Sequence, residues 1–204
     1  RVLGESIRDL KFFRFVETEI AGTPMVVSRT GWSGQGGYEI YLQEPDAGIS
    51  LWDTLAAAGE DLQVRAGCPN LIERIESGLL SYGNDMTAQN NPYECGLGKF
   101  CSTQTAIGCV GRDALLRVAQ EGPVRQIRAL EIQSDSLPPC DRPWSVMAGK
   151  KRVGFVTSAA QSPDYGCGVA MGMIRMTHWD EGTELTVQTP AGDKAAVVRE
   201  TFWL

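Results

Sequence analysis

Residues Ser28 to Tyr41 read SRTGWSGQGGYEIY, and this stretch decides how the first half of the chain folds. The PMVVSRT run from Pro24 is β-branched and of strand length, and YEIYL from Tyr38 to Leu42 alternates as a half-buried strand does. Dinucleotide and phosphate loops place their glycines between a strand and a helix, whereas here a strand follows the glycines. The stretch therefore predicts two strands joined by a glycine-rich loop.

A carboxylate and three aromatic rings lie in or beside this loop. Trp32 is at the loop tip, and Glu39 stands beside Tyr38 and Tyr41. One carboxylate accepts two parallel N–H donors from the N–C–N edge of a cyclic amidine such as a pterin. Glu39 is therefore a candidate ligand for such a ring, and an ordinary hairpin with cross-strand aromatics is the alternative.

The remainder of the first 121 residues is expected to mix strands and helices. The aromatic and β-branched run LKFFRFV, Leu10 to Val16, predicts a strand. Apolar residues at three- and four-residue spacing predict helices. These helices are expected from Asp46 to Gly59, from near Pro69 to Gly83, and from Asp113, as N-cap, to Gly122.

Beyond Gly122 the helical period disappears, and short strand-like runs recur between turn signals. This pattern predicts a small all-β barrel or sandwich. The fold class is therefore α+β, with one domain at 1–121 and a second at 122–204. The expected strands are Gln126–Ile132, Lys151–Thr157, Gly168–Ile174, Glu184–Gln188 and Ala195–Glu200, with a hairpin turn in TPAGDK from Thr189.

Composition excludes several classes of protein. The chain has 204 residues, 43% hydrophobic and 22% charged, which is ordinary globular composition rather than that of a disordered chain. A net charge of −6 opposes nucleic-acid binding. No apolar window is long enough for a membrane span, and the first residues lack a signal peptide's apolar core. We expect neither a nucleic-acid nor a membrane partner.

Cysteine and histidine usage argues against metal and disulfide chemistry. The six cysteines include no CxxC pair, and His178 is the only histidine, so neither a structural zinc site nor a multi-histidine site is signalled. We expect no metal, and reduced thiols in a cytoplasmic protein. The chain begins at Arg1 without a methionine, and we expect it to be a piece of a longer protein.

Five stretches of the chain, in order and at matching spacing, resemble the glycine-cleavage T-protein family of folate-dependent aminomethyltransferases. SRTGWSGQGGYEIY is similar to that family's SRTGYTGEDGFE, and IERIESGLLSYGND from Ile72 is similar to RLEAGLCLYGND. The other matches are NPYECGLGKF from Asn91, VGRDALLR from Val110 and GFVTSAAQSPDYGCGVAMGMI from Gly154. The resemblance implies that 1–121 is the C-terminal part of a folate-binding core and 122–204 is a C-terminal β-barrel.

Within this superfamily the chain resembles the dimethylsulfoniopropionate demethylases more closely. They share the block CPNLIERIESGLLSYGND from Cys68, whereas T-proteins carry Ala-Arg-Asp where Pro69, Asn70 and Leu71 stand here. Tryptophan at position 32, where T-proteins tend to have tyrosine, also agrees with the demethylases. The resemblance implies transfer of a methyl group from dimethylsulfoniopropionate to tetrahydrofolate, the methyl acceptor.

The resemblance also implies that part of the enzyme lies outside this chain. Family members begin with another large segment that holds an aspartate near the reactive nitrogen of tetrahydrofolate. We therefore expect no catalytic residue in this piece, expect it to be inactive alone, and expect the absent N-terminal portion to be its partner.

The chemistry of the methyl donor is consistent with this interpretation. A sulfonium methyl is already activated because displacement releases a neutral thioether, so transfer needs neither metal nor redox cofactor. The enzyme's task is mainly to hold nucleophile and methyl carbon in line in a dry site. A sulfonium cation has no hydrogen-bond donor, so an aromatic face is its natural recognition element.

Matching this sequence to the family that it resembles, position by position, implies five binding residues. Trp32 would face the sulfonium, and Ser81 would bind the substrate carboxylate. Glu39 and Tyr41 would hold the pterin, and Phe13 would pack on the folate rings. The alternatives are ordinary packing for the aromatic residues and a plain helix-terminal hydroxyl for Ser81.

Arg74 and Glu76 lie two apart on the second helix and cannot share one face, so we expect them to anchor different neighbours. Two other functions stay open: a T-protein aminomethyltransferase working with a lipoyl carrier protein, and a folate-binding protein without turnover. The iron–sulfur maintenance branch is disfavoured because its KGCYxGQE motif is not found in the sequence.

Overall fold

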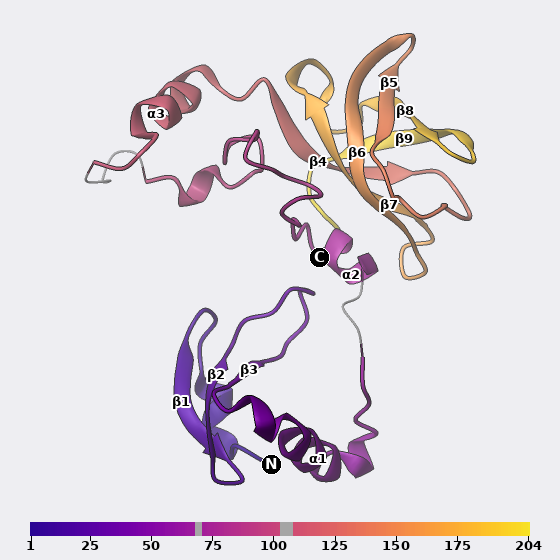
Figure 1. Cartoon of the computed structure of the whole chain (residues 1–204). Coiled ribbons are helices and arrows are strands. Elements are labelled where there is room, and N and C mark those ends of the chain that lie inside the picture. The colour runs from indigo at the N-terminus through magenta and orange to yellow at the C-terminus, as the bar shows by residue number, and fades with distance from the viewer. Residues whose placement is uncertain (68–70, 103–107) are drawn as a thin grey trace. The chain divides into compact units, whose positions relative to one another are not determined.

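The computed structural model describes residues 1–67, 71–102 and 108–204. The chain forms two compact units, unit 1 (Arg1–Pro69) and unit 2 (Asn70–Leu204) (Figure 1). Among the described residues, no helix has the length and apolar character needed to cross a bilayer.

Unit 1 is a three-stranded antiparallel sheet with one buried face. Its strands are β1 (Phe15–Ile20), β2 (Thr23–Ser28) and β3 (Glu39–Leu42), in the order β1-β2-β3. Ile20, Met25 and Val27 are buried and pack with Leu51 of α1 (Gly48–Ala58) and with Ile7 of the 3-10 helix η1 (Glu5–Asp9). Two further 3-10 helices are η2 (Pro45–Ala47) and η3 (Glu60–Leu62). The predicted strand–loop–strand unit is confirmed as β2 and β3.

The prediction of a first strand at 10–16 is wrong in position, because β1 begins only at Phe15. A turn precedes the strand: the N–H of Arg14 donates to the carbonyl of Lys11 at 3.1 Å, and Phe13 has a left-handed φ of 57°. The hydrophobic run suggested burial, yet Phe12 and Phe13 are 57% and 79% exposed. The prediction, which rested on hydrophobicity alone, therefore placed the start of this strand too early.

All three helices differ from their predicted bounds. α1 begins at Gly48, two residues after the predicted Asp46, which lies in η2, and it ends before Gly59, its C-cap residue, as predicted. α2 is Leu71–Glu76, so its predicted extension to Gly83 is wrong, and its predicted start near Pro69 lies outside the described residues. Gly78 ends the helical path with a φ of +68°, and a Cβ there would lie 2.5 Å from the ring of Phe202.

The third helix, α3 (Arg112–Glu121), begins before the predicted N-cap Asp113. Gly111 is the N-cap residue, with a left-handed φ of 83°. Asp113 lies in the first turn, where a carboxylate interacts favourably with the N-terminal end of the helix dipole.

Unit 2 contains a closed antiparallel barrel with strand order β4-β7-β6-β5-β8-β9 (Figure 1). β9 pairs with β4 and closes it. The core is a cluster of aliphatic side chains around Trp144. The barrel strands are β4 (Arg125–Ile132), β5 (Trp144–Ala148), β6 (Lys151–Ser162), β7 (Cys167–Arg175), β8 (Glu184–Thr189) and β9 (Gly192–Arg199). Two 3-10 helices, η4 (Gly98–Phe100) and η5 (Met176–His178), complete the unit.

The barrel confirms the predicted α+β class with a small C-terminal barrel, and sequence analysis missed only β5 among its strands. β5 is five residues long and follows Pro143. Its buried residues Trp144 and Val146 alternate with the less buried Ser145. A two-residue turn at Gly149 and Lys150 leads into β6. The predicted turn in TPAGDK is confirmed between β8 and β9. The predicted domain boundary between 121 and 122 stays a prediction.

Candidate functional site

The candidate site in unit 1 is built on the sheet face opposite the buried core. Ser28 of β2 is directly opposite Phe15 of β1 and Glu39 of β3. Directly opposite residues of antiparallel strands point to the same side, so these three side chains form one row. Phe15 is 66% exposed and Glu39 is exposed. Tyr41, 53% exposed, lies two residues further along the same face.

Hydroxyl groups orient the Glu39 carboxylate. Oε2 of Glu39 accepts hydrogen bonds from the hydroxyl of Thr30 and, at 3.2 Å, from that of Tyr41. The Thr30 hydroxyl also lies 3.0 Å from Oγ of Ser28. Within the described part of the chain, Oε1 of Glu39 has no hydrogen-bond partner, so one oxygen of an oriented carboxylate is open to a donor from solvent.

Phe13 lies beside this face in a strained conformation. Its N–H donates to the carbonyl of Arg29 at 3.2 Å, one residue before Thr30, and its φ is 57°. Arg29 also donates from Nη1 to the carbonyl of Leu10 at 2.8 Å, and its guanidinium lies 4.7 Å from the ring centroid of Phe12. A left-handed conformation costs a bulky residue about 1 to 3 kcal/mol. The turn therefore holds the Phe13 ring exposed instead of burying it.

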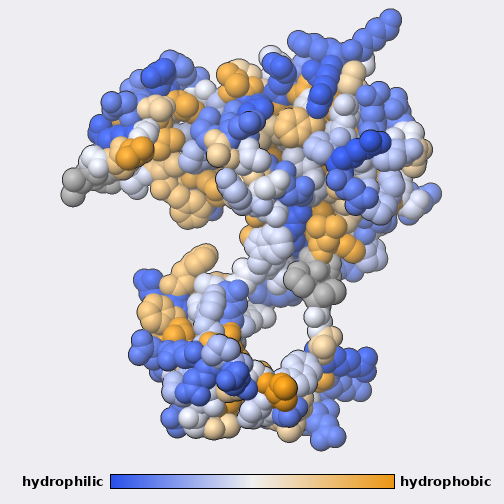
Figure 2. Space-filling model, viewed as in Figure 1, coloured by the Kyte–Doolittle hydropathy of each residue, from blue (hydrophilic) through white to orange (hydrophobic). Residues whose placement is uncertain are grey.

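Trp32 lies in the loop between β2 and β3. Trp32 is 45% exposed and also takes part in an interaction within the chain. On the face visible in Figure 2, hydrophobic residues (orange) reach the surface among hydrophilic ones (blue) in both units. Unit 1 thus carries Phe13, Trp32, Glu39 and Tyr41 of the predicted site residues, and hydrogen bonding directly joins Glu39 with Tyr41.

Ser81 belongs to unit 2, where it follows α2 in an irregular segment instead of ending the helix as predicted. Its N–H donates to Oδ2 of Asp85 at 2.8 Å, and its carbonyl accepts from the N–H of Asp85 at 2.8 Å. Its position is therefore fixed through Asp85.

Asp85 is the centre of a buried polar network that sequence reasoning did not find. Its Oδ2 accepts from Nη1 of Arg74 at 2.6 Å, and both side chains are almost fully buried. Its Oδ1 accepts from the hydroxyls of Thr157 and Ser158, each at 2.6 Å. Ser158 also accepts from Nη2 of Arg74 at 2.7 Å. The segment after α2 is thereby fastened to β6.

Arg74 and Glu76 anchor different neighbours, as predicted. Whereas Arg74 contacts Asp85 and Ser158, the carboxylate of Glu76 accepts from the hydroxyl of Ser162 at 2.5 Å. The carbonyl of Glu76 accepts the N–H of Trp203 at 2.8 Å. Both residues are buried and fix the fold.

The five cysteines that the structure describes are free thiols, and Cys68 lies outside the described residues. Burial raises the pKa of Cys140 to about 11, with a further contribution from the charge of Asp85. Burial also raises the pKa values of Cys95 and Cys167. At neutral pH these three thiols are protonated and poor nucleophiles.

Sequence reasoning missed Thr30, Ser28 and Arg29, which surround the predicted ligands. All three lie in the quoted SRTG stretch, and Ser28 and Thr30 alternate as same-face residues of a strand. The structure adds the register that brings Ser28 opposite Glu39. The sequence pattern could not give this register, because it depends on how many residues the glycine-rich loop takes up.

Two family models match successive parts of the chain. A family model described as "GCVT N-terminal domain" matches residues 3–105, and one described as "Glycine cleavage T-protein C-terminal barrel domain" matches residues 125–203. The dimethylsulfoniopropionate demethylase DmdA of Ruegeria pomeroyi is 53% identical over 203 residues, which cover 100% of this chain and 55% of that protein. An aminomethyltransferase of Synechococcus is 35% identical over 198 residues, 97% of this chain and 54% of that protein.

A solved structure agrees with the fold. The crystal structure of the glycine cleavage system aminomethyltransferase T from Bartonella henselae superposes with a TM-score of 0.75 at 24% identity, covering 97% of this chain and 54% of that one. The chain thus spans about half the length of the curated relatives it matches. On these two family models and this fold, the chain belongs to the glycine cleavage T-protein family.

Proposed function

We propose that this chain provides folate- and substrate-binding residues of a tetrahydrofolate-dependent methyltransferase that demethylates dimethylsulfoniopropionate. The products would be 5-methyltetrahydrofolate and methylmercaptopropionate. The observation that carries the proposal is the 53% identity, over the whole chain, to a protein named as that demethylase. The exposed and oriented Glu39 carboxylate supports it.

The residues of unit 1 fit a pterin. The amidine edge of a pterin presents two parallel N–H donors, one for each oxygen of a carboxylate on an accessible face. Oε1 of Glu39 is open within the described residues and would accept the first donor. The second donor would take the place of the Thr30 or the Tyr41 hydroxyl on Oε2. The exposed ring of Phe13 offers an apolar surface for a flat heterocycle. When bound, tetrahydrofolate would supply the nitrogen that accepts the methyl group.

Trp32 is proposed to recognise the sulfonium through its ring face, and Ser81 to recognise the substrate carboxylate. An aromatic face attracts a cation that has no hydrogen-bond donor, and a hydroxyl donates to a carboxylate. The exposure of Trp32 supports the first role. The hydrogen bonds between the Ser81 backbone and Asp85 support the second, because they fix the backbone that carries the hydroxyl. We also propose a cytoplasmic location, which the free thiols support.

The second candidate is an aminomethyltransferase that works with a lipoyl carrier protein. A relative named as an aminomethyltransferase, at 35% identity, favours it to a lesser degree. Two of the positions that separate the two groups in sequence, 69 and 70, lie outside the described residues. The functional test therefore has to include both one-carbon donors, the sulfonium and the aminomethyl-loaded carrier.

Binding is tested on the chain itself by calorimetric titration with tetrahydrofolate, for the natural chain and the Glu39→Gln variant. Turnover is tested on a chimera in which this chain replaces the segment of the Ruegeria pomeroyi demethylase that it matches. We expect the chimera to form 5-methyltetrahydrofolate from dimethylsulfoniopropionate. Activity only with an aminomethyl-loaded lipoyl carrier would establish the second candidate. Tetrahydrofolate binding without turnover on either donor would support a folate-binding protein instead.

A further inference from the structure

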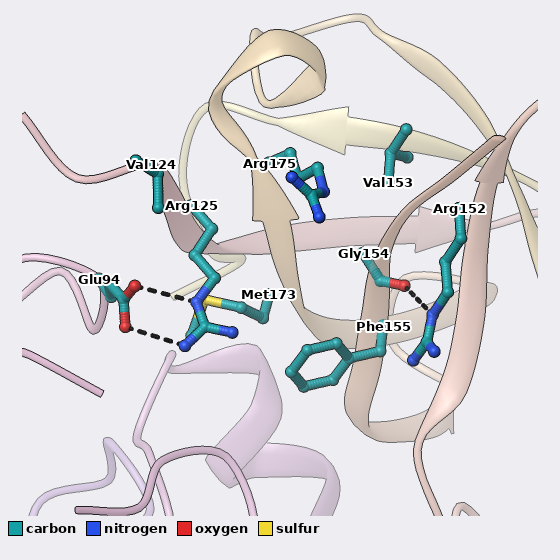
Figure 3. Close-up of a pocket in the computed structure, with 9 residues that line it drawn as sticks. All are labelled: Glu94, Val124, Arg125, Arg152, Val153, Gly154, Phe155, Met173 and Arg175. Carbon is teal, nitrogen blue, oxygen red and sulfur yellow. Dashed lines mark hydrogen bonds and ion pairs between the residues drawn. The ribbon is translucent and has the colours of Figure 1, made fainter. Parts of the chain in front are cut away.

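A cavity of about 530 Å³ lies at one end of the barrel, within unit 2 (Figure 3). Three neighbouring strands each contribute an arginine: Arg125 from the start of β4, Arg152 from the start of β6, and Arg175 from the end of β7. Arg125 and Arg175 are directly opposite each other across the β4–β7 pair. Like charges in this arrangement repel, so nearby negative charge stabilises the site.

The protein supplies only part of that negative charge. Glu94 is the one acidic residue of the lining, and it is buried. Its Oε1 accepts from Nε of Arg125 at 2.9 Å, and its Oε2 accepts from Nη2 of Arg125 at 3.4 Å and from Nδ2 of Asn90 at 3.1 Å. Glu94 is thus paired with Arg125 and does not neutralise the other two arginines.

Arg152 and Arg175 form no ion pair within residues 1–67, 71–102 and 108–204. The sequence has no aspartate or glutamate at positions 68–70 or 103–107, which lie outside these ranges. Arg152 donates from Nε to the carbonyl of Gly154 at 3.3 Å, and the rest of its guanidinium remains available. Both side chains are exposed. The cavity therefore holds a surplus of two positive charges in a chain whose net charge is −6.

The cavity also has an apolar wall. Phe155 and Met173 line it, and the guanidinium carbon of Arg152 lies 5.9 Å from the centroid of the Phe155 ring. In Figure 3 the Phe155 ring lies between the guanidinium groups of Arg125 and Arg152. Guanidinium groups match carboxylate and phosphate oxygens in a planar, two-point geometry, and an aromatic ring favours an apolar or flat ligand body. The volume is in the range of small-molecule sites.

We propose that this cavity binds a small organic dianion, a dicarboxylate or a phosphate monoester, with its oxyanions on Arg152 and Arg175 and its apolar body against Phe155 and Met173. All the residues that line the cavity belong to unit 2, whereas the proposed pterin-binding residues belong to unit 1. The proposal uses different residues and different probes, so it is tested independently of the methyltransferase function.

The test is calorimetric titration of the chain with two aryl dianions, phenyl phosphate and phthalate. Inorganic phosphate serves as a probe for the charge alone, and benzyl alcohol as a probe for the ring alone. We expect the two aryl dianions to bind more tightly than either partial probe, with an affinity that falls at high sodium chloride. In the double variant Arg152→Gln/Arg175→Gln, the affinity should fall at least about tenfold, since each lost charge-assisted hydrogen bond contributes that much. The preferred aryl dianion distinguishes a phosphate monoester from a dicarboxylate.

The matched control is Arg142→Gln, which removes the same charge from another exposed arginine of unit 2 that does not line the cavity. It should leave the affinity unchanged. Circular dichroism checks that the double variant is folded, and tetrahydrofolate titration checks that unit 1 is unaffected. Failure of both aryl dianions to bind, binding that the double variant retains, or binding of inorganic phosphate as tight as that of phenyl phosphate would overturn the proposal.

Discussion

The hydroxyl of Tyr41 lies 3.2 Å from Oε2 of Glu39, two residues away on the same face of β3. Because Thr30 donates to the same oxygen, the carboxylate is oriented by two hydroxyl groups while Oε1 stays open within the described residues. The geometry resembles that of a ligand-binding group more than that of a surface charge, which would have no fixed orientation.

Replacing Glu39 by Gln keeps the shape of the side chain and removes its charge. Tetrahydrofolate affinity should fall by about 1.5 to 3 kcal/mol, or roughly 10- to 150-fold, because a charge-assisted pair is lost. Thermal stability should hardly change, since Glu39 is exposed. Calorimetric titration and differential scanning calorimetry measure the two effects. Intact folate binding with a lowered melting temperature would assign Glu39 a structural role instead.

The second prediction concerns the two half-exposed tryptophans of unit 1. Trp32→Ala should weaken dimethylsulfoniopropionate binding by about 1 to 2 kcal/mol, or roughly 5- to 30-fold, and Trp32→Phe should lose less. Trp52, 46% exposed on α1, is a matched control, because Trp52→Ala removes an equally exposed indole from a different place. Titration of the chimera measures all three variants. Equal losses for Trp32→Ala and Trp52→Ala would remove Trp32 from the site.

The third prediction concerns the buried network behind Ser81. Asp85→Asn should lower the free energy of unfolding by about 3 to 5 kcal/mol, because it leaves the Arg74 guanidinium buried without its counter-charge. The comparison is Glu131→Gln, which breaks the half-exposed pair with Arg199 in the same unit and should cost less than about 1 kcal/mol. Urea unfolding followed by circular dichroism gives both values. Similar losses in the two variants would show that burial of the Arg74 pair is unimportant.

The fourth prediction is a pH dependence. The folded-state pKa of Cys140, about 11, is raised above the ordinary value of 9.0, so between these pH values the folded protein holds a proton that the unfolded chain has released. The free energy of unfolding should therefore fall as the pH rises through this window. The contribution of Cys140 to it should be fully present below pH 9. The slope of unfolding free energy against pH should be shallower in Cys140→Ala than in the natural chain. Parallel slopes would mean that Cys140 does not contribute.

Local pattern was sufficient where local chemistry decides the structure. Alternation in YEIYL predicted β3. Pattern failed where a distant residue decides the outcome. The second helix stops at Glu76 because Gly78 turns away beneath the ring of Phe202, more than a hundred residues later in the chain. No window around Gly78 contains that ring.

In the candidate site too, the sequence predicted some features and could not predict others. Residue types indicated Glu39 and Tyr41, but the role of Thr30 depends on the length of the glycine-rich loop, which sets the pairing of Ser28 with Glu39. Phe13 was assigned from resemblance within a predicted strand, whereas the structure presents it from a left-handed turn. The charged cavity could not be predicted, because its three arginines come from strands that only the closed barrel brings together.

The network that joins Arg74, Asp85 and Ser158 also sets an order of assembly. α2 is only six residues long, too short to persist by itself in water, and the guanidinium of Arg74 finds Ser158 84 residues later. A contact of such sequence separation has to overcome the entropy cost of closing a long loop, so it forms late in folding. We therefore expect the segment that carries Ser81 to take its final shape only once β6, which supplies Ser158, is in place.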